Sequence, residues 1–523
     1  MGACSRLLAA AVAIAAFAIA HGCDSGEGSG ADEARGRDVR DAMADPAADA
    51  VAETGTDPLR DAPEDFVEEA FAETATDPIE DEAIAADPHE DEAVAADIPA
   101  DEAVEDTSPP QGQFCHSIDE CTDDEVCEFS LGKCQRRGTW TESDIALYNW
   151  HPAAAAPGDL LVIDGAAFYI PSLMGGSARV RIGSVQLGGI NLPADENRMI
   201  VKVTAGMKGP ISVFDSTGKS ASVPGIFEQA PTGIIPCDAG TPMASGVAGD
   251  GPRHVGPYAA GYEDLPDDLG TRVFYPAECG SIRRPPVKGT WPLVIILHGN
   301  GALYLNHEHL AQLLSTWGFV SVMPSTMMNM MNEDQEALVQ QVMPLVVRVR
   351  GRDLGGEHAV LAGVQTTDQV AWVGHSRGTG RAEELIAADG DLEDDTVGGI
   401  FLGPVDDGET LPGALMVFHG GKDAQSGMAN CTSPYDNSDG PKWLIDIPGG
   451  NHGSFCDHKV YGYGTFGALM GDAKPTISRH RQLQIVETFA IPLMQRAFGL
   501  DQPFASVLDQ PPASPDYTVR HED

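Results

Sequence analysis

The chain of 523 residues is too long for one ordinary domain, so we expect roughly two to four structural units. Its formal net charge of -47 at pH 7 arises from 79 Asp and Glu against 32 Lys and Arg. Nucleic acids and anionic lipid surfaces attract clustered Lys and Arg. The acidic balance therefore excludes nucleic acid as a partner and gives no support to binding through anionic lipids.

Residues 1–22 have the pattern of an export signal peptide. A positive charge at Arg6 precedes an apolar run over residues 7–20. The run is shorter than the ~20 apolar residues of a transmembrane helix, so we expect cleavage rather than a membrane span. The sequence AHGC at residues 20–23 resembles a bacterial lipobox, which implies a lipid on Cys23 and an anchored protein of the cell envelope. A plain secreted protein is the alternative.

Residues 23–112 form an acidic tract that is rich in Ala and Pro. The segments DEAIAAD, DEAVAAD and DEAV begin at positions 81, 91 and 101 and repeat one another. With few aromatic residues and much like charge, the tract cannot bury enough apolar surface to offset its chain entropy. We therefore predict a disordered acidic linker that acts as a stalk.

Cysteine usage agrees with export. Of the 10 cysteines, Cys4 lies in the signal and Cys23 is the lipidation candidate, which leaves an even number suited to disulfides. Four of them lie in a Cys-rich module at residues 113–137. Because that module lacks the paired CxxC spacing of a zinc site, we expect two disulfides, and their connectivity stays open. Its cysteines are Cys115, Cys121, Cys127 and Cys134.

The remaining four cysteines lie in the second half of the chain. A disulfide between Cys431 and Cys456 would brace two loops that carry candidate catalytic residues. A disulfide between Cys237 and Cys279 would tie the segment entering the C-terminal domain to its first strand. We predict both pairs.

Residues 141–230 contain short Val- and Ile-rich runs separated by Gly and Pro, which predicts a small all-β sandwich. The runs are DLLVIDG, ARVRIGSVQLGG, RMIVKVTAG and GPISVFDSTGKSASVPGIF. With Gly165, Phe168, Gly183 and Gly218, the segment resembles an IPT/TIG domain, which is an immunoglobulin-like β-sandwich. The resemblance implies a spacer or interaction module without catalytic residues, whose partner would be a carbohydrate or a protein.

From residue 231 to 505, buried strands alternate with helices, which predicts an α/β domain with a mostly parallel sheet flanked by helices. The expected strands are TRVFYP, PLVIILHG, GFVSVMPS, QVAWVGHS, VGGIFLGP, ALMVFHGG and KWLIDIPG. The expected helices cover roughly residues 303–317, 332–349, 377–388 and 478–498. Residues 506–523 are expected to form a C-terminal tail.

Residues 374–378 read GHSRG, a G-x-S-x-G pentapeptide with Ser376 at its centre. The strand QVAWV leads into it and the helical segment RAEELIAAD follows, which is the strand-turn-helix setting of a nucleophile elbow. The glycines permit the close backbone contacts of such a sharp turn. We therefore predict Ser376 as a nucleophile, with the backbone N–H of Arg377 facing the oxyanion.

A second oxyanion donor should come from the loop after an earlier strand. In PLVIILHGNGA, Gly299 and Gly301 let the chain pass close to a substrate carbonyl. The backbone N–H of Asn300 is therefore the candidate, with Gly301 next. His298 is more simply explained by packing or hydrogen bonding beneath the loop.

On this type of fold the catalytic acid and base follow the nucleophile in the chain. Asp423 comes just past the end of a buried strand, and His452 lies in a Gly-rich loop after the next strand. We predict His452 as the general base and Asp423 as the acid that holds its tautomer. The alternative acids and bases are Asp406, Asp407, His419, His458 and His480.

Residues 292–456 resemble the chlorophyllase, dienelactone hydrolase and cutinase-like group of α/β-hydrolases, through PLVIILHGNGA, HLAQLLSTWGFVSVMPS, VGHSRGTG, HGGKD and GGNHGSF. The resemblance implies an α/β-hydrolase fold and a Ser-Asp-His hydrolase of carboxylic esters with little or no lid. The substrate would be a small or polymeric ester, and we expect no metal and no other cofactor. Two alternatives stay open: an inert surface adhesion or scaffold protein, and amide or thioester hydrolysis by the same triad.

Overall fold

The predicted signal peptide, Cys23, the acidic linker and Asn300 all lie outside the residues that the structure describes. Every described residue belongs to the second of two compact units, residues 99–523. No helix of the described part is long and apolar enough to cross a membrane. The computed structural model describes residues 113–137, 144–168, 178–187, 197–215, 217–265, 270–299, 304–325, 335–356, 358–405, 411–457, 473–501 and 503–523.

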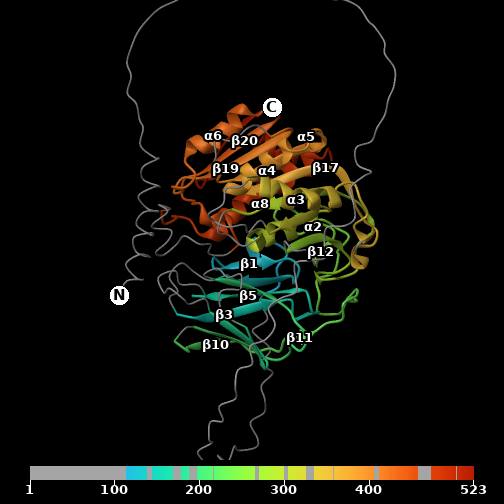
Figure 1. Cartoon of the computed structure of the whole chain (residues 1–523). Coiled ribbons are helices and arrows are strands. Elements are labelled where there is room, and N and C mark those ends of the chain that lie inside the picture. The colour runs from blue at the N-terminus through green and yellow to red at the C-terminus, as the bar shows by residue number, and fades with distance from the viewer. Residues whose placement is uncertain are drawn as a thin grey trace, which may run out of the picture. The chain divides into compact units, whose positions relative to one another are not determined.

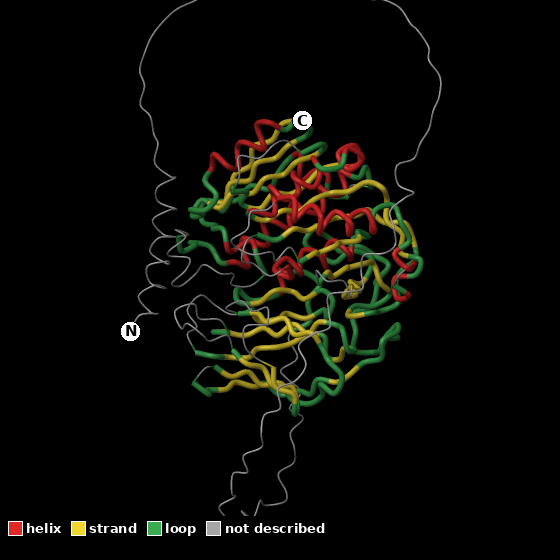
Figure 2. Tube along the Cα trace, in the orientation of Figure 1, coloured by secondary structure: helices red, strands yellow, loops and turns green. Residues whose placement is uncertain are grey.

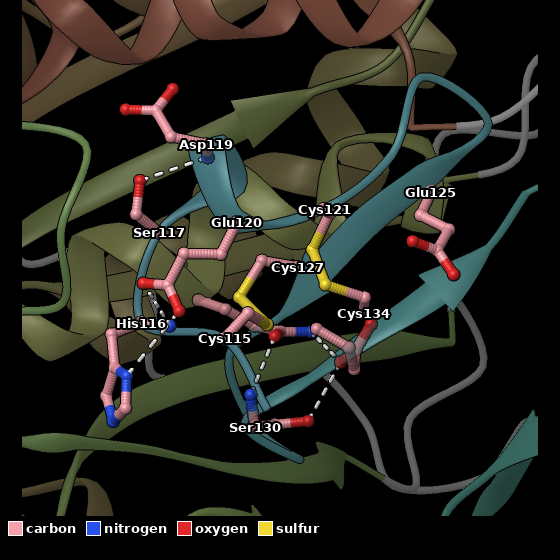
Figure 3. The surroundings of a disulfide bond; sticks show 12 residues. Cys115, His116, Ser117, Asp119, Glu120, Cys121, Glu125, Cys127, Ser130 and Cys134 are labelled. Atoms are coloured by element: carbon pink, nitrogen blue, oxygen red, sulfur yellow. Dashed lines mark hydrogen bonds and ion pairs between the residues drawn. A yellow bond between two sulfur atoms is a disulfide. The ribbon is translucent and has the colours of Figure 1, made fainter. Parts of the chain in front are cut away.

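The Cys-rich module is a short hairpin stapled by two disulfides (Figure 3). Cys115 bonds to Cys127 and Cys121 to Cys134, so the prediction of two disulfides is confirmed and the connectivity is first to third and second to fourth. Too few apolar residues are available here for a core of its own, so the disulfides hold the hairpin. Its elements are η1 (Ile118–Glu120), β1 (Glu125–Glu128) and β2 (Lys133–Arg136).

Residues 144–229 contribute two antiparallel sheets that enclose one apolar core, as an all-β sandwich requires. Gly165 fits beneath the ring of Phe168, where any Cβ would overlap the ring and the carbonyl of Ala146. The IPT/TIG identity stays a prediction. One sheet has β3 (Ala146–His151), β5 (Leu160–Ala166) and β8 (Arg198–Lys202), and the other has β6 (Arg179–Ile182), β7 (Val185–Leu187), β9 (Ile211–Phe214) and β10 (Ser220–Ser222). A short parallel pair joins β4 (Ala154–Ala155) to β11 (Glu228–Gln229).

A ten-stranded sheet forms the centre of the C-terminal part, in the order β14-β12-β13-β16-β15-β17-β18-β19-β20-β21. Figure 1 labels its strands β12, β17, β19 and β20. The strands from β16 to β20 pair parallel, whereas β12 with β13, β13 with β16, and β20 with β21 pair antiparallel. The predicted mostly parallel sheet is therefore confirmed. The strands are β12 (Ala259–Leu265), β13 (Thr271–Ala277), β14 (Ser281–Ile282), β15 (Gly289–Leu297), β16 (Val320–Pro324), β17 (Val364–His375), β18 (Thr396–Leu402), β19 (Ala414–Gly420), β20 (Lys442–Ile447) and β21 (Thr518–Glu522).

Helices cover both faces of this sheet (Figure 2). Along β15, Val294 and Ile296 belong to the core shared with α2 and α8, while Ile295 and Leu297 face the opposite core, which includes residues of α3, α4, α5 and α6. This two-sided burial explains the near-continuous apolar runs of the central strands. The helices are α2 (Glu308–Thr316), α3 (Gln335–Val349), α4 (Arg377–Ala387), α5 (Gly390–Asp395), α6 (Met428–Asn437), α8 (Arg479–Ala497) and α9 (Ala505–Asp509), with short turns η2 (Tyr304–His307), η3 (Leu354–Gly356), η4 (Ala359–Leu361) and η5 (Gly453–Phe455).

The last residues of the chain belong to the sheet rather than to the expected tail. Leu508 of α9 is buried, and its carbonyl accepts a hydrogen bond of 3.1 Å from the indole of Trp443. Strand β21 then pairs antiparallel with β20 and extends the sheet by one strand.

One predicted disulfide of the second half is present and the other is wrong. Cys237 bonds to Cys279. Cys431 and Cys456 are not bonded to each other. Cys431 belongs to the core on one face of the sheet, whereas Phe455, the neighbour of Cys456, belongs to the core on the other face. Cys431 on α6 packs in the α3–α6 core with its Sγ 3.3 Å from Ser426 Oγ, whereas Cys456 lies 3.5 Å from the ring of His375.

The sandwich, the Cys-rich module and α2 meet around a set of fully buried charges. Arg198 on β8 donates to Asp164 on β5 at 2.7 Å and to Glu308 at the start of α2 at 3.1 Å. The other carboxylate oxygen of Glu308 accepts from Arg272 on β13 at 2.6 Å. From the Cys-rich module, Arg137 bridges Asp164 and Glu128. Buried charges require such pairing, so these modules form one continuous structure with α2.

Candidate active site

Ser376 lies between the end of β17 and the start of α4, in the strained backbone conformation of a nucleophile elbow. Its φ and ψ are 55° and -126°, which is a rare conformation for a residue with a Cβ. The turn requires its two glycines. A Cβ on Gly374 would lie 2.7 Å from the backbone of Thr379, and a Cβ on Gly378 would overlap the carbonyl of Leu297. The G-x-S-x-G pentapeptide is therefore a structural elbow in this protein.

Asp423 and His452 form a buried hydrogen-bonded pair at the same edge of the sheet. The Nδ1 atom of His452 lies 2.7 Å from Oδ2 of Asp423. The other carboxylate oxygen accepts from the backbone N–H groups of Gln425 at 2.9 Å and Ser426 at 2.7 Å. These two bonds fix the carboxylate, which in turn holds the imidazole so that Nε2 faces away from the aspartate.

Gly403 places this pair next to the elbow. The residue follows β18, whose Leu402 carbonyl accepts the backbone N–H of Ser376 at 2.9 Å. At φ +55°, a Cβ on Gly403 would lie 3.0 Å from both Asp423 Oδ2 and His452 Nδ1. The hydrogen bonds of the described residues include none between Ser376 and His452. Hydrogen bonds between a nucleophile and its base are often long until a substrate is present. We place Ser376 near His452 because Ser376 bonds to Leu402 and His452 lies beside the next residue, Gly403.

The loop that should supply the second oxyanion donor begins directly above Ser376. A Cβ on Gly299 would lie 2.8 Å from the Cβ of Ser376 and 3.4 Å from its Oγ. Asn300 itself lies outside the described residues. The first residue of α4 is Arg377, as predicted, so its backbone N–H belongs to the helix N-terminus that favours negative charge.

His298 supports this loop from below, as expected. Its Nδ1 lies 2.8 Å from the carbonyl of Gly299, and burial lowers the pKa of the imidazole to about 3. The guanidinium of Arg381 on α4 donates to the carbonyl of His298 at 3.1 Å. Arg381 thus links the nucleophile helix to the loop. No local motif marks Arg381 in the sequence, because the contact depends on how α4 packs beside β15.

The structure describes two of the alternative acids and bases, and neither of them lies at the candidate active site. His419 pairs with Asp446 on the neighbouring strand at 2.8 Å. His480 lies on α8, 3.2 Å from the carbonyl of Glu125 in the Cys-rich module. The remaining alternatives lie outside the described residues; they are Asp406, Asp407 and His458.

Two residues that sequence reasoning missed fix the loop of His452. Gln482 on α8 accepts the N–H of Asn451 at 3.0 Å and donates to its carbonyl at 2.8 Å. The side chain of Asn451 in turn accepts from the backbone of Ser454 at 3.1 Å and donates to Ala473 at 3.1 Å. The catalytic candidate is therefore held from both sides by amide groups. Asn451 could have been found from the sequence, because it directly precedes His452. Nothing in the sequence around Gln482 marks it as a partner of that loop.

A family model described as Chlorophyllase matches residues 267–406. No curated protein matches the chain. The match includes the loop at Gly299 and the elbow at Ser376, and it ends before Asp423 and His452. It implies the α/β-hydrolase fold, in agreement with the mixed sheet, and a hydrolase function.

Proposed function

We propose that this protein is an exported serine esterase that hydrolyses carboxylic esters through an acyl-enzyme on Ser376. The observation that carries the proposal is the position of the Asp423–His452 pair against Gly403, one strand end away from the strained Ser376. A serine at a strained turn, beside a buried His–Asp pair, is an arrangement that supports nucleophilic catalysis.

In the proposed reaction, Nε2 of His452 takes the hydroxyl proton of Ser376 while Oγ attacks the ester carbonyl. The tetrahedral oxyanion would be stabilised by the backbone N–H groups of Arg377 and Asn300. The imidazolium then protonates the leaving alcohol, and a water molecule activated by His452 releases the acid and restores the serine. Asp423 holds the imidazole tautomer and stabilises its positive charge throughout.

The cell location and the partners are part of the same proposal. The signal pattern and Cys23 support a lipid anchor in the cell envelope, and secretion is the alternative. The sandwich would bind a carbohydrate or protein partner, while the substrate is a small or polymeric ester. Metabolic labelling with an alkyne-tagged fatty acid tests the anchor: the label should appear on the wild-type chain and be lost in Cys23→Ser.

A fluorophosphonate probe tests the nucleophile directly. The wild-type chain should be labelled, Ser376→Ala should not, and Ser506→Ala, an exposed serine on α9, should be labelled like the wild type. Circular dichroism would verify that all three chains are folded. Equal labelling of Ser376→Ala and wild type, or no labelling of a folded wild type, would leave the inert scaffold as the better explanation.

A substrate series then separates ester hydrolysis from amide hydrolysis. p-Nitrophenyl esters of increasing acyl length would be compared with matched p-nitroanilides and thioesters on the same chain. We expect kcat/KM to be highest for the esters and to reveal the acyl length that the site accepts. A higher kcat/KM for the anilides or thioesters would overturn the esterase assignment while leaving the nucleophile intact.

A further inference from the structure

Three buried side chains that can bind a metal converge beneath the candidate active site. His307 ends η2, His375 ends β17, and Cys456 follows η5. Cys456 Sγ lies 3.5 Å from His375 Nδ1 and 3.8 Å from His307 Nε2, and all three ligand atoms lie within 4.8 Å of one another. The side chains are at most 2% exposed.

We infer that His307, His375 and Cys456 form a binding site for one Cu(I) ion. The three ligands would be the imidazole nitrogens His307 Nε2 and His375 Nδ1 and the thiolate of Cys456. Binding replaces the thiol proton by the metal: the S–H bond breaks, an S–Cu bond forms and one proton leaves to solvent, with no change of oxidation state. Metal binding here goes beyond the proposed ester hydrolysis and does not require an active Ser376.

The ligand spacing fits a bound metal. With bonds of about 2.3 Å to sulfur and about 2.0 Å to nitrogen, a sulfur ligand and a nitrogen ligand lie about 3.5 to 3.7 Å apart at tetrahedral to trigonal angles. The two sulfur-to-nitrogen distances of 3.5 and 3.8 Å bracket that range. The thiol of Cys456 is therefore spaced from each ring as it would be if the two shared one metal ion.

The hydrogen bonding of His375 also suits metal binding. His375 Nε2 lies 3.2 Å from the carbonyl of His452, so the ring donates there and leaves the lone pair of Nδ1 toward Cys456. A ring nitrogen must carry a free lone pair to bind a metal, and this hydrogen bond leaves one on His375 Nδ1.

The ligand types favour a soft monovalent ion. Within the described residues, this group of three contains no carboxylate, so the thiolate of Cys456 is its one negative ligand. One thiolate neutralises the single charge of Cu(I), and thiolate and imidazole ligands suit this soft ion.

A metal here would join three segments of the candidate active site. His375 directly precedes Ser376, Cys456 lies in the loop that follows His452, and His307 ends the turn that follows the loop at Gly299. Because a ligand that binds the folded state alone stabilises it, Cu(I) should raise the melting temperature.

Anaerobic titration of the full chain with Cu(I), against a chromophoric Cu(I) chelator, tests the site. The wild-type chain should take up one more copper ion than Cys456→Ser, and His307→Gln should bind more weakly than wild type. Cys431→Ser is the matched control, because it removes the other buried thiol on the opposite face of the sheet and should keep wild-type uptake.

X-ray absorption of the copper-loaded wild type needs no variant and should give one sulfur and two nitrogen ligands. Equal copper uptake by wild type and Cys456→Ser would overturn the inference, as would a copper environment without sulfur. Uptake of Zn²⁺ in preference to Cu(I) at this site would overturn the assignment of the ion. Circular dichroism of Cys456→Ser and His307→Gln would show that lost binding is not lost folding.

Discussion

Arg198, a residue of the β-sandwich, donates a hydrogen bond of 2.8 Å to the carbonyl of Leu305, which lies in η2 just after the loop that begins at Gly299. The same guanidinium binds Glu308, the first residue of α2. The β-sandwich therefore contacts η2, the segment that follows the candidate oxyanion loop in the chain. A module expected to act as a spacer thus supports the geometry of the site.

Arg198→Met should destabilise the protein strongly. The change leaves Asp164 and Glu308 buried without this partner, and breaking such a pair costs about 3–5 kcal/mol. Urea unfolding measures the loss. Arg181→Met on β6 is the control, because Arg181 is exposed and its replacement should change stability by at most about 0.5 kcal/mol. Equal free energies of unfolding for the two variants would show that the buried charge network contributes little to the stability of the fold.

Gly403→Ala should lower ester hydrolysis by about 100-fold, because the new methyl group pushes Asp423 and His452 apart. A control is needed to separate this effect from the backbone strain of an alanine at positive φ. Gly499 has a comparable φ of +63° with nothing within 4 Å of an added Cβ, so Gly499→Ala carries the same strain in open space. We expect it to lose about 1 kcal/mol of stability and to keep its kcat/KM. Similar activity of the two variants would count against the placement of the pair.

Asp423→Asn should reduce kcat by roughly 10⁴-fold, because the amide no longer holds the catalytic tautomer of His452. The matched control is Asp446→Asn, which alters a His–Asp contact between two strands of the sheet, Asp446 with His419 at 2.8 Å. That variant should keep near-wild-type kcat. Initial rates on the best p-nitrophenyl ester give both values, and a large loss in Asp446→Asn alone would point to the alternative base His419.

The buried pair of His309 and Asp457 should make the protein less stable at alkaline pH. Burial lowers the pKa of His309, but Asp457 and Glu487 together raise it to about 10, above the ordinary value of 6.5. The stabilisation is complete below pH 6.5 and is lost as the pH rises through about 10, because the folded state then gives up a proton that the unfolded state has already lost. His309→Gln should remove this slope.

Urea unfolding at intervals from pH 6 to pH 10 measures this effect, with the wild type and His309→Gln compared at each pH. The free energy of unfolding of the wild type should fall toward that of the variant as the pH rises. Parallel curves for the two chains would show that His309 does not supply the pH dependence.

The sequence predicted the elements around Ser376 because their patterns are local. The apolar runs of β13 and of β15 to β20 and the four expected helices lie where predicted, whereas α5, α6 and α9 were not predicted. The choice of Asp423 and His452 followed from the order of the strand ends. Strands β12 and β14 were missed, since β12 contains a glycine and two adjacent acidic residues, which are unusual in a strand, and β14 has two residues. The buried charge network was not predictable either, because its members come from elements far apart in the chain.

The wrong disulfide has a related cause. Cys431 and Cys456 flank the catalytic candidates in the sequence, and that nearness suggested a bond. Nearness in sequence does not say which face of a sheet a side chain meets. Cys431 lies on a helix of one face, while Cys456 follows a turn at the other, and only the packed sheet reveals the separation.

The buried charges between the sandwich and α2 limit how this architecture can be rearranged. A spacer attached by apolar contacts could be exchanged for another of similar shape, in evolution or by engineering. Here a replacement sandwich would have to supply its own cation at the position of Arg198, or Glu308 would lose one of its buried partners. The two modules are therefore expected to be inherited together, and chimaeras should fold only when both sides of the network come from one parent.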